Sequence, residues 1–257
     1  MAQTQEQRVI ANLESYLLLE GRKHGIYQYP NTLVPMERSH LNENWNQATA
    51  SLHQQREYML TIRQFADLLH LLKTGHAYDG AGKHLGKKKQ ETILEEITAE
   101  RSPWRSEWLD HFYLKKGSAL YVKYHILQGD GSPKQVEEPL EDCLMEDKQI
   151  DIFDWLAGAN SQGLPPKNVR SGKLNYWYPR ADHVAGFRAD AAGVSLVCNR
   201  DPQLSNAGLG VRAAISTGNI STKISQEESR LEEALKDMQE YLPPINLPKV
   251  REILREL

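Results

Sequence analysis

The stretch from Asn175 to Ala214 constrains the fold more than any other part of the sequence. Apolar side chains recur at every second residue along 187–191 and again along 194–198. Alternation with a period of two predicts β-strands that bury one face. Asp201-Pro202 interrupts the pattern, and residues 209–212 predict a last short strand.

The alternation divides the side chains of this stretch into two sets, because successive residues of a strand point to opposite faces. The set expected to point inward is Phe187, Leu196, Cys198, Leu209 and Val211. The set expected to point outward is Arg188, Asp190, Ser195, Val197 and Asn199. A slip of one residue would exchange the two sets, so the buried set fixes the register. Substitutions at a surface usually change stability by no more than about 0.5 kcal/mol, so the outward set can be exchanged at little cost.

The same stretch resembles a known family. Its motifs are Trp-Tyr-Pro-Arg at 177–180, Val-Ala-Gly-Phe at 184–187, Leu-x-Cys at 196–198 and Leu-Gly-Val-Arg-Ala-Ala at 209–214. They resemble the variable region of diversity-generating retroelement variable proteins, and the runs 138–147 and 163–166 look like the framework of that family. The resemblance covers roughly residues 25–215 and is most specific in residues 175–214. It implies an α+β, C-type-lectin-like fold of the formylglycine-generating-enzyme type, with small twisted antiparallel sheets and packed helices.

The resemblance also implies which residues bind the ligand. In that family, replacement of adenines in Asn codons does not produce Lys, Glu, Gln, Met or Trp, and residues 181–208 contain none of these except Gln203. Carrying the pattern over by the alternation gives these variable, ligand-binding positions: Asp182, His183, Arg188, Asp190, Ala192, Ser195, Val197, Asn199, Asp201, Leu204, Asn206 and Gly208. The framework positions are Tyr176, Trp177, Tyr178, Phe187, Pro202, Leu209 and Arg212. Arg200 fits either group, and Arg212 fits a buried partner of an acidic residue as well as an exposed site.

Composition excludes several classes of protein. With 257 residues, 40% hydrophobic and 25% charged, the chain is typical of a globular protein. The net charge of −3 does not favour nucleic-acid binding. No run of about eighteen apolar residues predicts a membrane-spanning helix. The first residues lack the apolar core of a signal peptide, so we expect synthesis in the cytoplasm, with a virion or a cell surface as an alternative final location.

Periodicity outside this stretch predicts mostly helices. The best-defined helix starts at Thr61, where Gln64 completes a capping box, and ends at Gly75. Other helices are predicted over 4–20, over 41–57, over 90–100, from Ser102-Pro103 and from Asp151, and a strand over 118–127. The expected organisation is an N-terminal helix in 1–24, a C-type-lectin-like domain in 25–215 with the variable region at about 180–212, and a linker with a C-terminal helical tail in 216–257.

No pattern of catalytic or metal-ligating residues stands out. Cys143 and Cys198 are isolated, and the histidines lack the spacing of a zinc site. We therefore expect a non-enzymatic protein without cofactor or metal, whose partner is a protein ligand on a cell or virus surface and which neither binds nucleic acid nor inserts into a membrane. Three alternatives remain open: an oxidase or hydrolase on the same scaffold, a structural component such as a phage fibre tip, and a plain hairpin surface. The terminal helices are candidates for forming a homo-oligomer.

Overall fold

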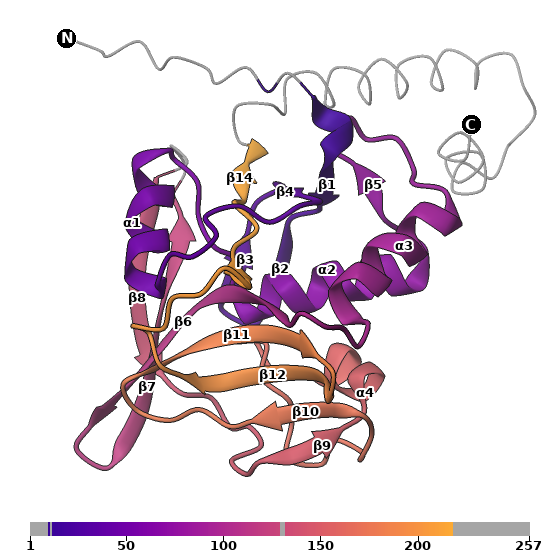
Figure 1. The fold of residues 1–257 in the computed structure, drawn as a ribbon. Helices are drawn as coiled ribbons and strands as arrows, with labels where there is room; N and C mark the ends of the chain where they lie inside the picture. The colour runs from indigo at the N-terminus through magenta and orange to yellow at the C-terminus, as the bar shows by residue number, and fades with distance from the viewer. Residues whose placement is uncertain (1–9, 11, 129–131, 218–257) are drawn as a thin grey trace, which may run out of the picture.

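The structure, a computed structural model, describes residue 10 and residues 12–128 and 132–217. Within these residues it contains four α-helices and three sheets in which most neighbouring strands are antiparallel, so the predicted α+β class is confirmed (Figure 1). The helices are α1 (Trp45–Gln54), α2 (Ile62–Thr74), α3 (Lys87–Thr98) and α4 (Ile152–Gly158).

The largest sheet contains the strands that form within residues 174–210. Its strands follow the order β8-β7-β6-β11-β12-β10-β9, and β13 also pairs with β6. All its pairings are antiparallel except those of β10 with β12 and of β13 with β6. The bounds are β6 Arg105–Lys116, β7 Ala119–Leu127, β8 Pro133–Pro139, β9 Lys148–Ile150, β10 Leu174–Trp177, β11 His183–Asp190, β12 Gly193–Arg200 and β13 Leu209–Gly210.

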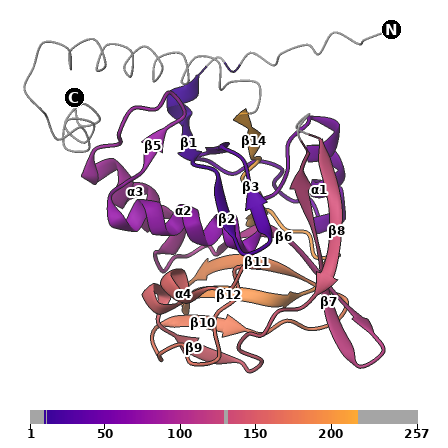
Figure 2. The same cartoon turned by 180° about the vertical axis from the view of Figure 1, so that it is seen from behind.

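Two smaller sheets involve the N-terminal part of the chain. One has the order β14-β4-β1-β5, and the other pairs β2 with β3. In Figures 1 and 2 the helix α2 lies between the four-stranded sheet and the large sheet, and it contacts both β1 and β6. The bounds are β1 Tyr16–Leu19, β2 Arg22–His24, β3 Tyr27–Tyr29, β4 Thr32–Pro35, β5 Tyr78–Asp79 and β14 Ile215–Ser216.

The main core forms around α2. This helix begins at Thr61, whose side chain accepts a hydrogen bond from the Gln64 amide in a complete capping box, and it ends at Gly75 in the left-handed conformation. Its Phe65 packs against Phe187 of β11, with ring centroids 5.0 Å apart. The predicted capping box and C-cap are therefore confirmed. We call the face of the large sheet that carries Phe187 the inner face.

Part of the opposite, outer face of the sheet is covered as well. Trp45, Leu52 and Trp108 form a second apolar cluster there, together with Val184 and Val211. Trp108 pairs directly with Gly186 of β11, so both lie on the outer face. The rest of the outer face, over β12 and β10, is not covered by this cluster.

The prediction of an N-terminal helix over 4–20 is wrong where the structure describes the chain. Residues 13–15 form a single 3-10 turn, and Tyr16–Leu19 forms β1, which pairs with β4 and β5. The run Leu17-Leu18-Leu19 is buried, so it suits a sheet with both faces covered. A short apolar run of this kind is ambiguous between helix and strand. Residues 1–9 and 11, and the predicted C-terminal helical tail from 218, lie outside the described residues.

The prediction of a helix starting at Ser102-Pro103 is also wrong. Residues 105–116 form β6, which pairs with β11 on one side and with β7 on the other. Trp104 and Trp108 are four residues apart, and this spacing places two side chains on one face of a strand as well as of a helix. The other predicted elements agree with the structure to within a few residues: α1 lies inside 41–57, α3 starts at Lys87 rather than 90, α4 is capped by Asp151, and β7 lies inside 118–127.

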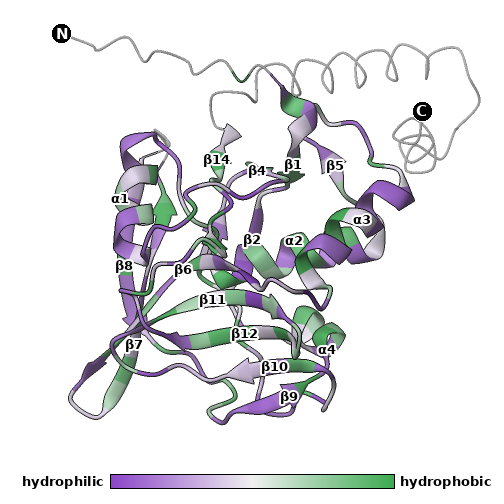
Figure 3. Ribbon diagram, viewed as in Figure 1, coloured by the Kyte–Doolittle hydropathy of each residue, from purple (hydrophilic) through white to green (hydrophobic). Residues whose placement is uncertain are grey.

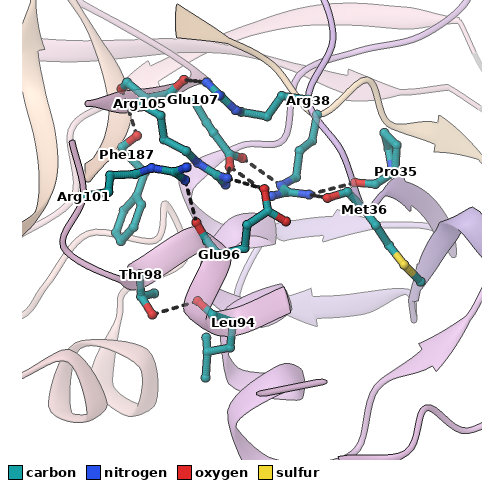
Figure 4. A network of polar contacts seen from close by, with 12 residues as sticks. Pro35, Met36, Arg38, Leu94, Glu96, Thr98, Arg101, Arg105, Glu107 and Phe187 are labelled. Carbon is teal, nitrogen blue, oxygen red and sulfur yellow. Dashed lines mark hydrogen bonds and ion pairs between the residues drawn. The ribbon is translucent and has the colours of Figure 1, made fainter. Parts of the chain in front are cut away.

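A buried ion network fixes the large sheet to the segment that follows β4 (Figure 4). Arg212 donates two hydrogen bonds to Glu107, of 2.9 and 3.1 Å, and Arg105 donates a third of 2.9 Å. Arg212 also donates to the carbonyl oxygens of Pro35 and Met36. Arg212 is only 2% exposed, so it is the buried partner of an acidic residue and not an exposed site. Burial raises the pKa of Glu107, but the charges of Arg212 and Arg105 outweigh this and lower it.

No helix in residues 12–128 or 132–217 has the length and apolar character needed to cross a bilayer.

Candidate binding cleft on the outer face of the sheet

The alternation along β11 and β12 follows the predicted parity. Hydrophobic and hydrophilic segments follow one another along β11 (Figure 3), where the sequence runs Phe187, Arg188, Ala189, Asp190. The five residues predicted to point inward, Phe187, Leu196, Cys198, Leu209 and Val211, are all buried. Leu209 and Val211 contribute to the outer-face cluster rather than to the main core. The predicted register of the two long strands is therefore confirmed, while the last short strand is buried on the opposite side of the sheet.

The side chains predicted to point outward gather around one cleft. Its volume is about 620 Å³, and it lies on the uncovered part of the outer face. The residues that line it are Gln149, Asn175, Trp177, Arg188, Asp190, Ala192, Ser195, Val197, Asn199 and Arg200. A volume of this size is within the range of sites that bind a small molecule or a few side chains of a partner.

Six of the twelve predicted ligand-binding residues line the cleft: Arg188, Asp190, Ala192, Ser195, Val197 and Asn199. They differ in accessibility. The side chain of Arg188 is 44% exposed, whereas Ser195 and Val197 are only 7% and 9% exposed. Ser195 pairs with Arg188 and Asn175 in the flanking strands, and Val197 pairs with Trp177, so these larger side chains enclose them. Ser195 and Val197 are therefore the floor of the cleft rather than an exposed rim.

The other six predicted residues do not line the cleft. Asp182 and His183 lie at the far end of β11, where the amide of Asp182 donates to the carbonyl oxygen of Tyr113. Asp201, Leu204 and Asn206 are exposed in the loop between β12 and β13. In this loop, Asp201 and Asn206 accept hydrogen bonds from main-chain amides two residues ahead.

Gly208 is a constrained position. A Cβ atom added there would lie 2.8 Å from the carbonyl oxygen of Trp104. The Gly208 carbonyl oxygen accepts hydrogen bonds from Arg38 (2.7 Å) and from the amide of Ser106 (2.8 Å). Any side chain at Gly208 therefore requires the main chain to shift, which disfavours variation at this position.

Two cleft residues were misassigned or left open by the sequence analysis. Trp177 was predicted to be framework, but its side chain is 43% exposed and lines the cleft beside Val197. Arg200, which the sequence leaves open between the two groups, lines the cleft because a β-bulge alters its parity. Val184 pairs with Arg200 and Gly186 with Val197, so β12 has one residue more than β11 between these pairs. The bulge turns Arg200 to the same face as Val197.

Gln149 and Asn175 complete the cleft and were not found from the sequence. Gln149 donates a 3.1 Å hydrogen bond to the Asn175 side chain, which in turn donates 3.2 Å to the carbonyl oxygen of Val194. They reach the cleft because β10 lies parallel to β12 and next to β9. Alternation within one strand carries no information about such a neighbour, so no local signal could have identified them.

The two arginines of the cleft have different surroundings. Arg188 forms an ion pair with Asp190, and its guanidinium carbon lies 5.6 Å from the centre of the Trp104 ring. Arg200 is 8% exposed and lies 5.6 Å from the centre of the Trp108 ring. In the described part of the chain, no acceptor lies within hydrogen-bonding distance of the buried Nη1 of Arg200, and no carboxylate pairs with this residue. Burial, and then the charge of Arg188, lowers the pKa of Arg200 to about 10.

The thiols do not form a reactive site. Cys143 and Cys198 are both buried, and burial raises the pKa of Cys143 to about 12 and that of Cys198 further. A thiol must ionise and be accessible to act as a nucleophile. Across residues 12–128 and 132–217, no group of three His, Cys, Asp or Glu side chains is placed to hold a metal ion.

Comparison of the chain with protein-family models, with curated proteins and with solved structures gives no match.

Proposed function

We propose that this protein is a non-enzymatic binding protein that displays the cleft between β11, β12 and β10 to a protein ligand. We further propose that it is a variable protein of a diversity-generating retroelement, with a C-type-lectin-like fold. The ligand would be a protein on the surface of a cell or a virus. The observation that carries the proposal is the clustering of six predicted variable residues around one cleft, over strands whose opposite face is core.

The arrangement suits exchange of the cleft residues. Strands hold the positions of the side chains through main-chain hydrogen bonds that do not depend on residue type. The inner face supplies the packing energy, through Phe187, Leu196 and Cys198 in the main core. A binding site built on such a rigid support keeps its preorganisation when its side chains change.

The first experiment compares two triple variants. In one, the outer residues change as Arg188→Ser, Val197→Thr and Asn199→Ser. In the matched control, the inner residues change as Phe187→Ser, Leu196→Thr and Cys198→Ser. We expect the outer variant to stay within about 3 kcal/mol of the parent free energy of unfolding, from roughly 0.5 kcal/mol at each of Arg188 and Asn199 and about 1–2 kcal/mol at Val197, which is only 9% exposed. The inner variant should not fold, since each large core truncation costs about 2–5 kcal/mol. Comparable losses in both variants would reject the proposal.

The second experiment tests binding. A library randomised at the six cleft positions is displayed on yeast and sorted against a panel of purified globular proteins. We expect clones that bind one panel member, with affinity lost when the cleft residues revert. Clones that remain folded but bind none of the proteins would count against a display function.

The mechanism of variation has its own test. A near-copy of the codons for residues 175–214, differing mainly at adenines and lying beside a reverse transcriptase gene, supports diversification by a retroelement. A genomic neighbourhood without such a copy would leave a fixed binding protein.

An oxidase or hydrolase on the same scaffold is not favoured by any observation, since the Cys198 thiol is buried with a raised pKa.

A further inference from the structure

The floor of the cleft contains a cation, Arg200, for which the described residues provide no hydrogen-bond acceptor and no carboxylate. Arg200 reaches the outer face through the β-bulge in β12. Its guanidinium stacks on Trp108 and borders the cleft, and its buried Nη1 donates to no acceptor in the described residues. Buried polar groups in proteins are almost always hydrogen-bonded, and buried charges are almost always paired. The buried guanidinium of Arg200 therefore lacks, among the described residues, the hydrogen-bond acceptor that such a group normally has.

The described surroundings of Arg200 supply no partner for it. Gly186, opposite Val197, has no side chain; a Cβ there would lie 3.7 Å from Nε of Arg200 but only 2.9 Å from the Glu107 carbonyl oxygen, so no side chain at this position can pair with Arg200. The one carboxylate among the residues that line the cleft, Asp190, is already paired with Arg188. The preceding residue, Asn199, has a side chain that makes no hydrogen bond within residues 12–128 and 132–217 and that also lines the cleft. The missing element is therefore an acceptor that enters from the solvent side.

We infer that the cleft receives an acidic side chain, Asp or Glu, of the protein ligand, and that its carboxylate pairs with Arg200. This inference rests on the proposed function and specifies the chemistry of the ligand. A carboxylate matches a guanidinium through two parallel, charge-assisted hydrogen bonds. Trp177, which forms a wall of the same cleft, contacts the apolar part of the acidic side chain and the residues beside it. Because Arg188 is neutralised by Asp190, it contributes less to this recognition than Arg200.

The inference explains why one site can vary and still bind proteins. Arg200 and Trp177 form a fixed pair at the floor and wall, while the six exchangeable positions surround them. Interfaces obtain most of their binding energy from a few buried aromatic and Arg residues, and the surrounding contacts tune specificity. Each variant of the cleft would then dock an acidic residue and select what lies next to it.

The test uses the full chain and two small probes. One probe is N-acetyl-glutamate N-methylamide, and the other is the matching glutamine compound. Binding is measured by two-dimensional NMR of the arginine Nε–Hε groups, with Trp fluorescence as the second readout. We expect saturable binding of the glutamate probe that perturbs the Arg200 signal, and at least about tenfold weaker binding of the glutamine probe, because only the glutamate carboxylate carries a negative charge and accepts two parallel hydrogen bonds from a guanidinium.

Matched variants assign the effect to one arginine. Arg200→Gln should weaken binding of the glutamate probe by about tenfold or more. The matched control is Arg170→Gln, which should change it by less than about threefold, because Arg170 is exposed, pairs with Asp154 and does not line the cleft. Arg200→Lys, which keeps the charge, should retain part of the binding. Undiminished binding in Arg200→Gln, an equal loss in Arg170→Gln, or tighter binding of inorganic phosphate than of the glutamate probe would each overturn the inference.

The two proposals fail in different ways. If the yeast library yields binders but the glutamate probe does not distinguish Arg200→Gln from the parent, the inference is wrong and the proposed function stands. If the outer triple variant does not fold, the proposed function is wrong, whatever the probes show.

Discussion

Replacing Arg200 by Met is expected to make the free protein more stable. The change removes a buried charge that has no partner in the described residues. Met is unbranched at Cβ and follows the aliphatic part of the Arg200 side chain, and although it is shorter than Arg, its thioether is flexible enough to make a favourable sulfur–aromatic contact with Trp108. If Arg200 serves binding rather than folding, its loss should relieve a cost that the free protein carries.

The size of the effect follows from the surroundings of Arg200. Burial and the Arg188 charge lower its pKa from 12.5 to about 10. At 1.36 kcal/mol per pKa unit, this disfavours the charged form in the folded state by roughly 3 kcal/mol relative to the unfolded chain. The contact with the Trp108 ring offsets about 1 kcal/mol of that cost. The net stabilisation expected for Arg200→Met is therefore about 1–2 kcal/mol.

The assay is urea denaturation at pH 7, followed by Trp fluorescence and circular dichroism. A stabilised variant shifts the midpoint upward while the slope with urea concentration stays the same. Arg188→Met is the control, since it removes an exposed ion pair and should change stability by no more than about 0.5 kcal/mol. A loss of more than 1 kcal/mol in Arg200→Met would refute the reasoning, because it would mean that Arg200 stabilises the fold.

Three further changes test other parts of the structure. Gly208→Ala should destabilise the protein by about 1–3 kcal/mol, because the added Cβ meets the Trp104 carbonyl oxygen; a neutral result in thermal denaturation would mean that the loop shifts without cost. Arg212→Met should cost about 3–5 kcal/mol in urea denaturation, since Glu107 would remain buried with less compensation, and a cost below 1 kcal/mol would show that Arg105 suffices. Burial lowers the pKa of His111 to about 4, so the unfolded chain takes up a proton below pH 6.5 while the folded state does not, and stability should fall by roughly 3 kcal/mol between pH 6.5 and 4. His111→Asn should reduce the fall in unfolding free energy between pH 6.5 and 4, measured by urea denaturation at each pH. An unchanged fall would mean that other groups cause it.

The local features of the fold could be predicted from the sequence. Thr61, Gln64 and Gly75 define α2 because a capping box and a left-handed C-cap are formed by residues within a few positions of each other. The parity of Phe187 and Arg188 was predictable for a similar reason, since a strand alternates its side chains whatever it pairs with.

The features that depend on distant partners could not be predicted. Tyr16–Leu19 and Arg105–Lys116 have helical spacings, and both form strands because β4, β5, β7 and β11 supply their hydrogen bonds. Arg200 faces the cleft only because β12 has one residue more than β11 between two pairs. Trp177 joins the cleft because β10 lies parallel to β12. Tertiary pairing overrides local preference in each case.

We propose separate roles for the two faces of the sheet formed by β10, β11 and β12, and a comparison of two libraries tests this division. One library is randomised at Arg188, Asp190, Ala192, Ser195, Val197 and Asn199, and the other at Tyr176, Ala185, Phe187, Ala189, Leu196 and Cys198. The fraction of folded clones in each is measured by protease resistance on the yeast surface. Most clones of the first library should resist proteolysis, and few of the second should. Similar fractions in the two libraries would show that the faces do not differ in this way.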